Sequence, residues 1–226
     1  YPQLAVDNHR VYYGEGSATM AFSNVAHMKE LDFPTDQDRA QYWLPENVKS
    51  GVHMDSLFKR LVFGWRSRMF FQLVFSDLIN DKTRVHYLRM PIERLERIAP
   101  FLFIDSNPYA VAADGKIVWL LNAMTTSDRY PYSLKEELGD KSDERSTLRR
   151  RGRWVNYIED SVKVTIDAST GQVTLYKIKD SPVINAWARV YPGLFVDGSK
   201  MPQSIRAQLT YPTQLFHVQF DDIYML

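Results

Sequence analysis

Cysteine is absent from this sequence of 226 residues. Its absence excludes disulfide bonds, thiolate nucleophiles, zinc fingers and iron–sulfur clusters. The charge is also nearly balanced, with 28 Lys and Arg against 27 Asp and Glu and a formal net charge of +1. A chain without a strong excess of positive charge has no overall attraction for a polyanion, and we expect no nucleic-acid partner.

Long apolar stretches are missing as well. The longest uncharged stretch, residues 207–220, contains glutamine, threonine, proline and histidine. It is shorter than the roughly 18–20 apolar residues of a membrane-spanning helix. The sequence has no secretory signal pattern and opens at Tyr1-Pro2 rather than at Met. We therefore expect it to be a section of a longer protein.

The motifs of common enzyme classes are not found. The sequence has no GxxxxGK[ST] or GxGxxG phosphate-binding loop, no GxSxG nucleophile turn, and no two of its five histidines at the spacing of a zinc protease. Four aspartates lie at expected strand ends or turns, where they could supply oxygen ligands to a cation. Turns alone also favour aspartate, so their position has a structural explanation as well. They are Asp105, Asp114, Asp128 and Asp167. We expect no metal and no cofactor.

The strongest helical pattern begins at Met54. Apolar residues recur at 3.6-residue spacing from Met54 to Met69, and residues 69–75 are apolar apart from Gln72. This pattern predicts a helix over 54–79 whose second part enters the core. Residues 33–51 are polar with two prolines and are expected to form a loop.

Two β-hairpins are predicted in the middle of the chain. The first is centred on Asp114-Gly115, a dipeptide that forms tight turns. Its second strand includes residues 117–121, which are apolar without alternation and predict a central strand covered on both faces. In the second hairpin, residues 162–166 alternate between apolar and polar, Gly171 lies in the turn, and the return strand alternates again. That alternation predicts a sheet with one face in water.

The C-terminal part is expected to be helical. Ser181-Pro182 is a favourable helix start, residues 202–209 predict a short helix, and Tyr211-Pro212 begins another. The predicted fold class is α+β, a mainly antiparallel sheet with β-hairpins flanked by several helices. We expect residues 1–226 to form a single domain, or part of one, with a charged loop at 133–153.

A polar segment follows the first hairpin and is the candidate binding site. It combines hydroxyls, a carboxylate, a guanidinium and two phenols, and such a group of side chains at the end of a core strand is typical of a binding loop. The alternative is an ordered turn in which these groups satisfy the local backbone. The candidate residues are Thr126, Ser127, Asp128, Arg129, Tyr130 and Tyr132.

The charged segment 133–153 is the second candidate contact. It carries seven basic and five acidic residues and includes Arg149, Arg150 and Arg151. One interpretation is a long mobile surface loop, and the other is contact with an anionic group such as a lipid headgroup. The interleaved acidic residues weaken the second interpretation.

Several long segments resemble one family. ADGKIVWLLNAMTTSDRYPYS and WVNYIEDSVKVTIDASTGQVTLY are similar to uncharacterised protein family 0182 of prokaryotic integral membrane proteins. Further pieces resemble it in the same order: RVYYGEG, ERLERIAPFLFIDSNPYAVAADG, VYPGLF and MPQSIRAQLTYPTQLFHVQ. The sequence departs from the family at 133–153, which is longer and more basic. The resemblance brings no activity, cofactor or catalytic residue with it.

The resemblance implies a place in a larger protein. Family members look like polytopic membrane proteins with a large hydrophilic region, and this chain would be an extracytoplasmic part of that region, linked to the membrane through segments absent from this sequence. We expect a non-enzymatic domain that binds an envelope component, such as a lipid headgroup, or a partner protein. The alternative is a hydrolase-like envelope enzyme that uses Asp128 with Arg129 and a tyrosine, and this requires Asp128 within about 3 Å of another functional group.

Overall fold

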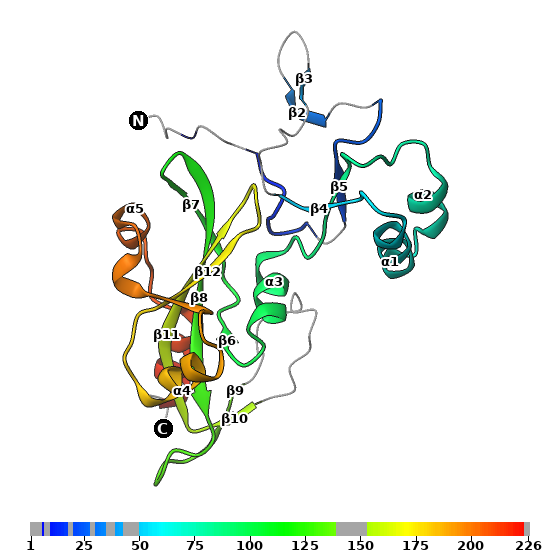
Figure 1. The fold of residues 1–226 in the computed structure, drawn as a ribbon. Helices are drawn as coiled ribbons and strands as arrows, with labels where there is room; N and C mark the ends of the chain where they lie inside the picture. Colours follow the sequence, from blue (N-terminus) through cyan, green and yellow to red (C-terminus); the bar gives the residue numbers. More distant parts are fainter. Residues whose placement is uncertain are drawn as a thin grey trace. The chain divides into compact units, whose positions relative to one another are not determined.

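A computed structural model describes residues 6, 10–17, 20–27, 30–34, 39–42, 50–138 and 153–223. The chain divides into two compact units (Figure 1). The sheet unit comprises Tyr1–His9, Pro91–Asp167 and Gln172–Leu226, and the helix-pair unit comprises Arg10–Met90 and Ala168–Gly171. The predicted α+β class is confirmed, because antiparallel pairs dominate the strands and helices accompany them.

Six strands of the sheet unit form one sheet in the order β13-β12-β11-β8-β6, with β7 also paired to β8. Only the β12–β13 pair is parallel within this sheet. The strands are β6 (Phe103–Ile104), β7 (Tyr109–Ala113), β8 (Lys116–Ser127), β11 (Tyr157–Asp167), β12 (Val173–Lys177) and β13 (Phe195–Asp197). Both predicted hairpins are present as β7–β8 and β11–β12.

Apolar clusters pack on both faces of this sheet. On one face, helices α3 (Pro91–Ile98) and α4 (Pro182–Val190) contribute Leu95 and Ile184 to a cluster with β8 and β11. On the other face, Met201 and Ile205 pack against Leu120. The second face is covered by the turn η1 (Gly198–Lys200) and helix α5 (Gln203–Arg206), followed in the chain by α6 (Thr213–His217) and the π-helical turn η2 (Val218–Ile223).

The prediction that β8 is covered on both faces is confirmed. The prediction that the β11–β12 hairpin has one face in water is wrong, because Lys163 and Thr165 of β11 are buried along with their apolar neighbours. The C-terminal segment covers this face, and its Thr210 carbonyl accepts a hydrogen bond from Lys163. A strand pattern reports the polarity of its side chains, whereas their burial depends on segments distant in the sequence.

A β-bulge interrupts the pairing of β8 and β11. The register shifts between Asp160 and Val162, which leaves Ser161 as the extra residue. Val162 lies in the cluster that α3 and α4 cover. The bulge places Asp160 on the face of Lys163, to which its carboxylate is joined at 2.7 Å.

Short strands occupy residues 136–138 and residue 153 of the predicted charged loop at 133–153. Strands β9 (Glu136–Leu138) and β10 (Arg153–Val155) pair with each other in antiparallel fashion. Residues 139–152 lie outside the described residues, and so do Arg149, Arg150 and Arg151.

The described residues of the helix-pair unit form two small sheets and two helices. Its strands β1 (Ala21–Ser23), β5 (Arg84–His86) and β4 (Val52–His53) form one antiparallel sheet in that order. Strands β2 (Glu30–Pro34) and β3 (Arg39–Tyr42) form another. The prediction of a loop over 33–51 is therefore wrong at residues 33–34, which end β2, and at β3, a polar strand that pairs through its backbone and lacks an apolar alternation.

His86 lies at the centre of the helix-pair unit and is fully buried. The ring of Tyr12 stacks on it, with ring centroids 4.4 Å apart. The hydroxyl of Ser23 lies 2.9 Å from His86 Nε2, and the hydroxyl of Ser50 lies 3.3 Å from Nδ1. Both ring nitrogens therefore have a hydrogen-bonding hydroxyl, an arrangement typical of a structural histidine.

The predicted helix over 54–79 is divided into α1 (Leu57–Ser67) and α2 (Phe70–Phe75). Ser56 caps α1 by accepting a hydrogen bond from the Lys59 backbone N–H. Arg68 ends α1 in the left-handed conformation, with φ of 58°, and this turn separates the helices. The prediction that residues 69–75 enter the core is wrong for most of them: Leu73 is buried, but Phe71 and Phe75 are 78% and 71% exposed.

Candidate functional site

The predicted polar loop, residues 126–132, lies at the end of β8 and beyond it. Thr126 and Ser127 are the last residues of β8, and the Ser127 hydroxyl accepts a hydrogen bond from the Arg129 backbone N–H at 3.1 Å. The Asp128 carboxylate lies 3.9 Å from Arg129 Nε and 3.6 Å from Lys135 Nζ. These distances describe ion pairs in solvent, longer than the separation that acid–base work by Asp128 requires.

Asn156 holds this polar loop in place. Its side-chain oxygen accepts from the Tyr130 backbone N–H at 2.9 Å, and its amide donates to the carbonyls of Tyr130 and Ser133. The Tyr130 ring stacks on Tyr157, with centroids 5.6 Å apart. Tyr132 has a positive φ of 59° and a fully exposed side chain. The loop therefore has an ordered backbone and presents its side chains to solvent.

A buried polar network lies in the sheet unit, centred on Lys163. This lysine is 4% exposed, and its Nζ donates to Asn122 Oδ1 at 2.6 Å and to Asp160 Oδ2 at 2.7 Å. Asp105, also buried, accepts from the Thr213 backbone N–H at 2.7 Å and from the Asn122 amide at 3.4 Å. The network therefore joins β8 and β11 to the C-terminal segment.

The two carboxylates of the network each keep an oxygen without a hydrogen bond. Asp105 Oδ1 and Asp160 Oδ1 are buried and have no partner among the described residues. Burial raises the pKa of Asp160, against the lowering effect of Lys163. Metal-binding side chains do not gather in threes anywhere in the described ranges. Asp105 was one of the four predicted cation ligands, and the structure joins it to an amide and a backbone N–H.

A second polar cluster surrounds Glu159. The hydroxyls of Ser161 and Ser181 donate to its Oε2 at 2.8 and 2.5 Å, and Thr125 lies 2.7 Å from the Ser161 hydroxyl. Burial would raise the pKa of Glu159, but hydrogen bonds from Ser181, Ser161 and Tyr157 hold it below its ordinary value. The cluster joins the start of α4 to the sheet, and no periodic pattern in the sequence indicates it.

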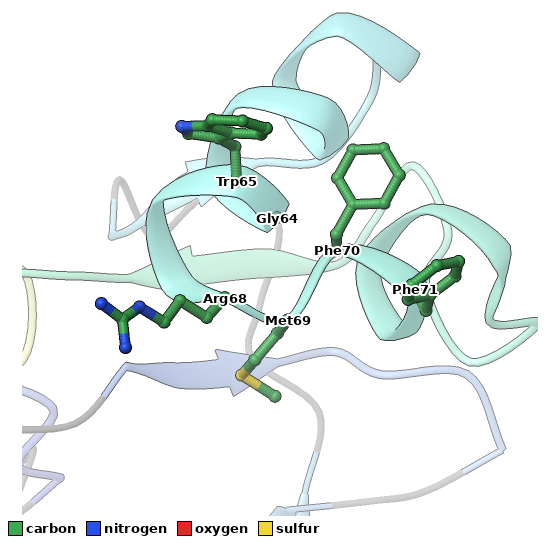
Figure 2. Close-up of a pocket in the computed structure, with 6 residues that line it drawn as sticks. All are labelled: Gly64, Trp65, Arg68, Met69, Phe70 and Phe71. Carbon is green, nitrogen blue, oxygen red and sulfur yellow. The ribbon is translucent and has the colours of Figure 1, made fainter.

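A group of exposed apolar side chains lies on α1 and α2 in the helix-pair unit. We define the α1–α2 surface by its exposed apolar side chains: Leu57, Phe58, Val62, Trp65, Met69, Phe71 and Phe75. Phe58 is 73% exposed and Trp65 83%. A groove of about 670 Å³ lies where the helices meet, lined by Gly64, Trp65, Arg68, Met69, Phe70 and Phe71 (Figure 2).

The charge on these helices has one sign. Residues 57–75 include Lys59, Arg60, Arg66 and Arg68 and no acidic residue. Lys59 pairs with Asp55 and Arg60 with Asp81, both outside this range. The α1–α2 surface is therefore both apolar and cationic. The helical periodicity located these residues, but it assigned their apolar side to the core.

The sequence is similar to proteins that are much longer than this chain. The family model described as "Uncharacterised protein family (UPF0182)" matches residues 1–225. A UPF0182 protein of Methanospirillum hungatei is 37% identical over 220 residues, 97% of this chain and 23% of that protein. Another from Salinispora tropica is 33% identical over 229 residues, 96% of this chain and 23% of that protein. The chain thus spans less than a quarter of these curated relatives. No solved structure matches it.

The helices in the described part of the chain are short. None of them is long and apolar enough to cross a membrane.

Proposed function

Because the chain belongs to the uncharacterised protein family UPF0182, we propose that it is a non-enzymatic extracytoplasmic domain of a membrane protein that binds an envelope component. The membrane link and the location follow the resemblance to polytopic proteins noted from the sequence. The binding role is supported by features of the chain itself.

The α1–α2 surface is the single observation that carries this function. Large contiguous apolar patches are rare on soluble proteins and mark interaction sites. Phe58, Trp65, Phe71 and Phe75 are each more than two-thirds exposed. Removing such a side chain from water contributes about 1.5–3 kcal/mol when burial is complete. A partner that covers these side chains removes them from water, and this burial stabilises the complex relative to the free domain.

The polar loop favours binding over catalysis. Its Asp128 and Arg129 are exposed and paired at 3.9 Å, without the close neighbour that would tune them for proton transfer. Its backbone is held by Asn156. A rigid loop with exposed polar side chains suits a second contact, and we keep the loop and Arg149, Arg150 and Arg151 as proposed contacts with the same envelope component.

The test is co-sedimentation of the purified chain with envelope membranes from the source organism. We expect the chain to sediment with the membranes and Phe71→Ser to reduce its recovery. Phe216→Ser is the matched control: Phe71 stacks on Phe75, and Phe216 stacks in the same i,i+4 manner on Phe220 in the sheet unit. Equal recovery of the wild type and Phe71→Ser would remove the α1–α2 surface from the proposed function.

A further inference from the structure

We propose that the α1–α2 surface binds the headgroup region of an anionic phospholipid bilayer, with α1 lying in the plane of the membrane. This inference rests on the proposed function and names its partner. Three features of the helix pair support it: the placement of its aromatic side chains, the sign of its charge, and the way in which its opposite side is anchored.

The exposed apolar side chains are continuous along α1. Phe58, Val62 and Trp65 follow one another at intervals of four and three residues, and they therefore form one stripe of α1. Phe71 and Phe75 extend the apolar surface on α2, with their rings stacked. A helix of 11 residues is about 16 Å long, half the thickness of a bilayer core, so α1 fits along the interface and not across it.

Two arginines follow Trp65, the most exposed aromatic residue of the α1–α2 surface, in the chain. Trp65 is followed in the sequence by Arg66, and Arg68 lies at the end of α1; Figure 2 shows Trp65 and Arg68. Both arginines are exposed, and no acidic side chain pairs with either among the described residues. Tryptophan with arginine at the edge of an apolar stripe is the composition of interfacial helices. The absence of acidic residues over 57–75 makes the surface complementary to anionic headgroups.

The opposite side of α1 is fixed to the helix-pair unit. Phe63 packs edge-on against Tyr87, with centroids 5.4 Å apart. Arg60 donates to the Met54 carbonyl at 3.0 Å. At the turn, a Cβ on Gly64 would lie 3.0 Å from the Phe70 Cα, so α2 approaches α1 closely. The helices are therefore held with their aromatic side outward.

A bilayer suits this surface better than a protein does. The groove is shallow and its side chains project in several directions (Figure 2). A stable protein interface needs a well-fitted area of roughly 800 Å² on each partner. Lipid chains and headgroups adapt to an uneven surface, and binding then scales with the apolar area and the charge that they cover.

The experiment measures binding of the purified chain to vesicles by flotation. The vesicles are phosphatidylcholine alone, or phosphatidylcholine with about one third phosphatidylglycerol to supply negative charge. We expect binding to the anionic vesicles that weakens with added salt. The double variant Arg66→Gln/Arg68→Gln should bind roughly 25-fold more weakly, since each cation near the surface contributes about fivefold. Phe71→Ser should lose about tenfold or more.

Matched variants in the sheet unit control for charge and for aromatic loss. Arg189→Gln/Lys200→Gln removes the same charge from exposed positions, and Phe216→Ser removes the stacked phenylalanine of α6. Both should bind the anionic vesicles as the wild type does. Far-UV circular dichroism of each variant establishes that it is folded.

The outcomes separate this inference from the proposed function. Equal binding to both kinds of vesicle, or no effect of the two arginines, overturns the anionic bilayer as partner. If vesicles are not bound but envelope membranes are, and Phe71→Ser abolishes that recovery, the partner is an envelope protein and only the lipid inference fails. Self-association that Phe71→Ser abolishes assigns the surface to a second copy of the chain. Failure to bind either vesicles or envelope membranes overturns both proposals.

Discussion

Replacing Lys163 with methionine tests whether the buried network holds the sheet unit together. Methionine retains an unbranched side chain of similar length and removes the charge. In the native chain, Lys163 Nζ donates to Asn122 at 2.6 Å, to Asp160 at 2.7 Å and to the Thr210 carbonyl at 3.3 Å. The variant leaves these acceptors behind, and the Asp160 carboxylate loses the cation that is hydrogen-bonded to it.

The size of the effect follows from burial. Removing one partner of a buried ion pair costs about 3–5 kcal/mol, because the other charge stays buried without compensation. Lys163 is nearly inaccessible, and Asp160 Oδ1 already lacks a hydrogen bond among the described residues. We therefore expect Lys163→Met to fall in this range. A loss of that size is a large part of the typical stability of a domain.

Lys177→Met is the matched control on the neighbouring strand. Lys177 donates to an asparagine oxygen at 2.9 Å and pairs with Asp180 at 3.5 Å, so its partners are of the same kinds. Asp180 is exposed to solvent, where an ion pair contributes little. We expect this variant to unfold within error of the wild type.

Two measurements report these changes. Urea unfolding followed by far-UV circular dichroism gives the stability of the chain, and amide hydrogen exchange of β8 and β11 reports the sheet unit alone. If Lys163→Met were tolerated as well as Lys177→Met, the burial argument would be refuted, since solvent would then be replacing the lost cation.

Three further predictions concern other parts of the chain. Gly171→Ala should destabilise by about 2 kcal/mol more than Gly16→Ala in urea unfolding, because both positions have positive φ but only at Gly171 would a Cβ lie 2.6 Å from the Tyr13 ring. The pKa of Asp160 is raised in the folded chain, so its contribution to stability is complete below about pH 3.9 and is lost as the pH rises through the pKa of the folded state. In Asp160→Asn this loss should vanish from unfolding free energies measured over a series of pH values, and the same pH dependence in the variant would contradict the prediction. Asn156→Ala should raise amide exchange in the polar loop about tenfold and leave β12 unchanged, because three hydrogen bonds to the loop are lost.

The hairpins and C-terminal helices were predictable because their signals are local. Asp114-Gly115 supplies a turn with φ of 51° and 73°, and Ser181-Pro182 begins α4. Such signals depend on the conformations open to a few adjacent residues. The polar loop was located for the same reason, at the end of a strand whose apolar run identified it as central. Its support by Asn156, 26 residues from Tyr130, has no local signal.

The burial of polar residues and the exposure of apolar ones were not predictable in the same way. The alternation in β11 correctly predicted that Lys163 and Thr165 lie on one side of the strand. Whether that side contacts water depends on the segment around Thr210, which folds over it.

The apolar stripe on α1 is the opposite case, because its apolar side chains are exposed. Periodicity shows that one side of a helix is apolar, and a core is the usual reason. The same pattern arises when the apolar side is reserved for a partner, and what distinguishes the two is the charge on its borders. A core-facing stripe leaves both signs of charge on the solvent side, whereas residues 57–75 carry basic residues alone. The sign of the charge beside an apolar stripe, together with the number of exposed aromatic side chains on it, is therefore the sequence signal that could have identified this surface.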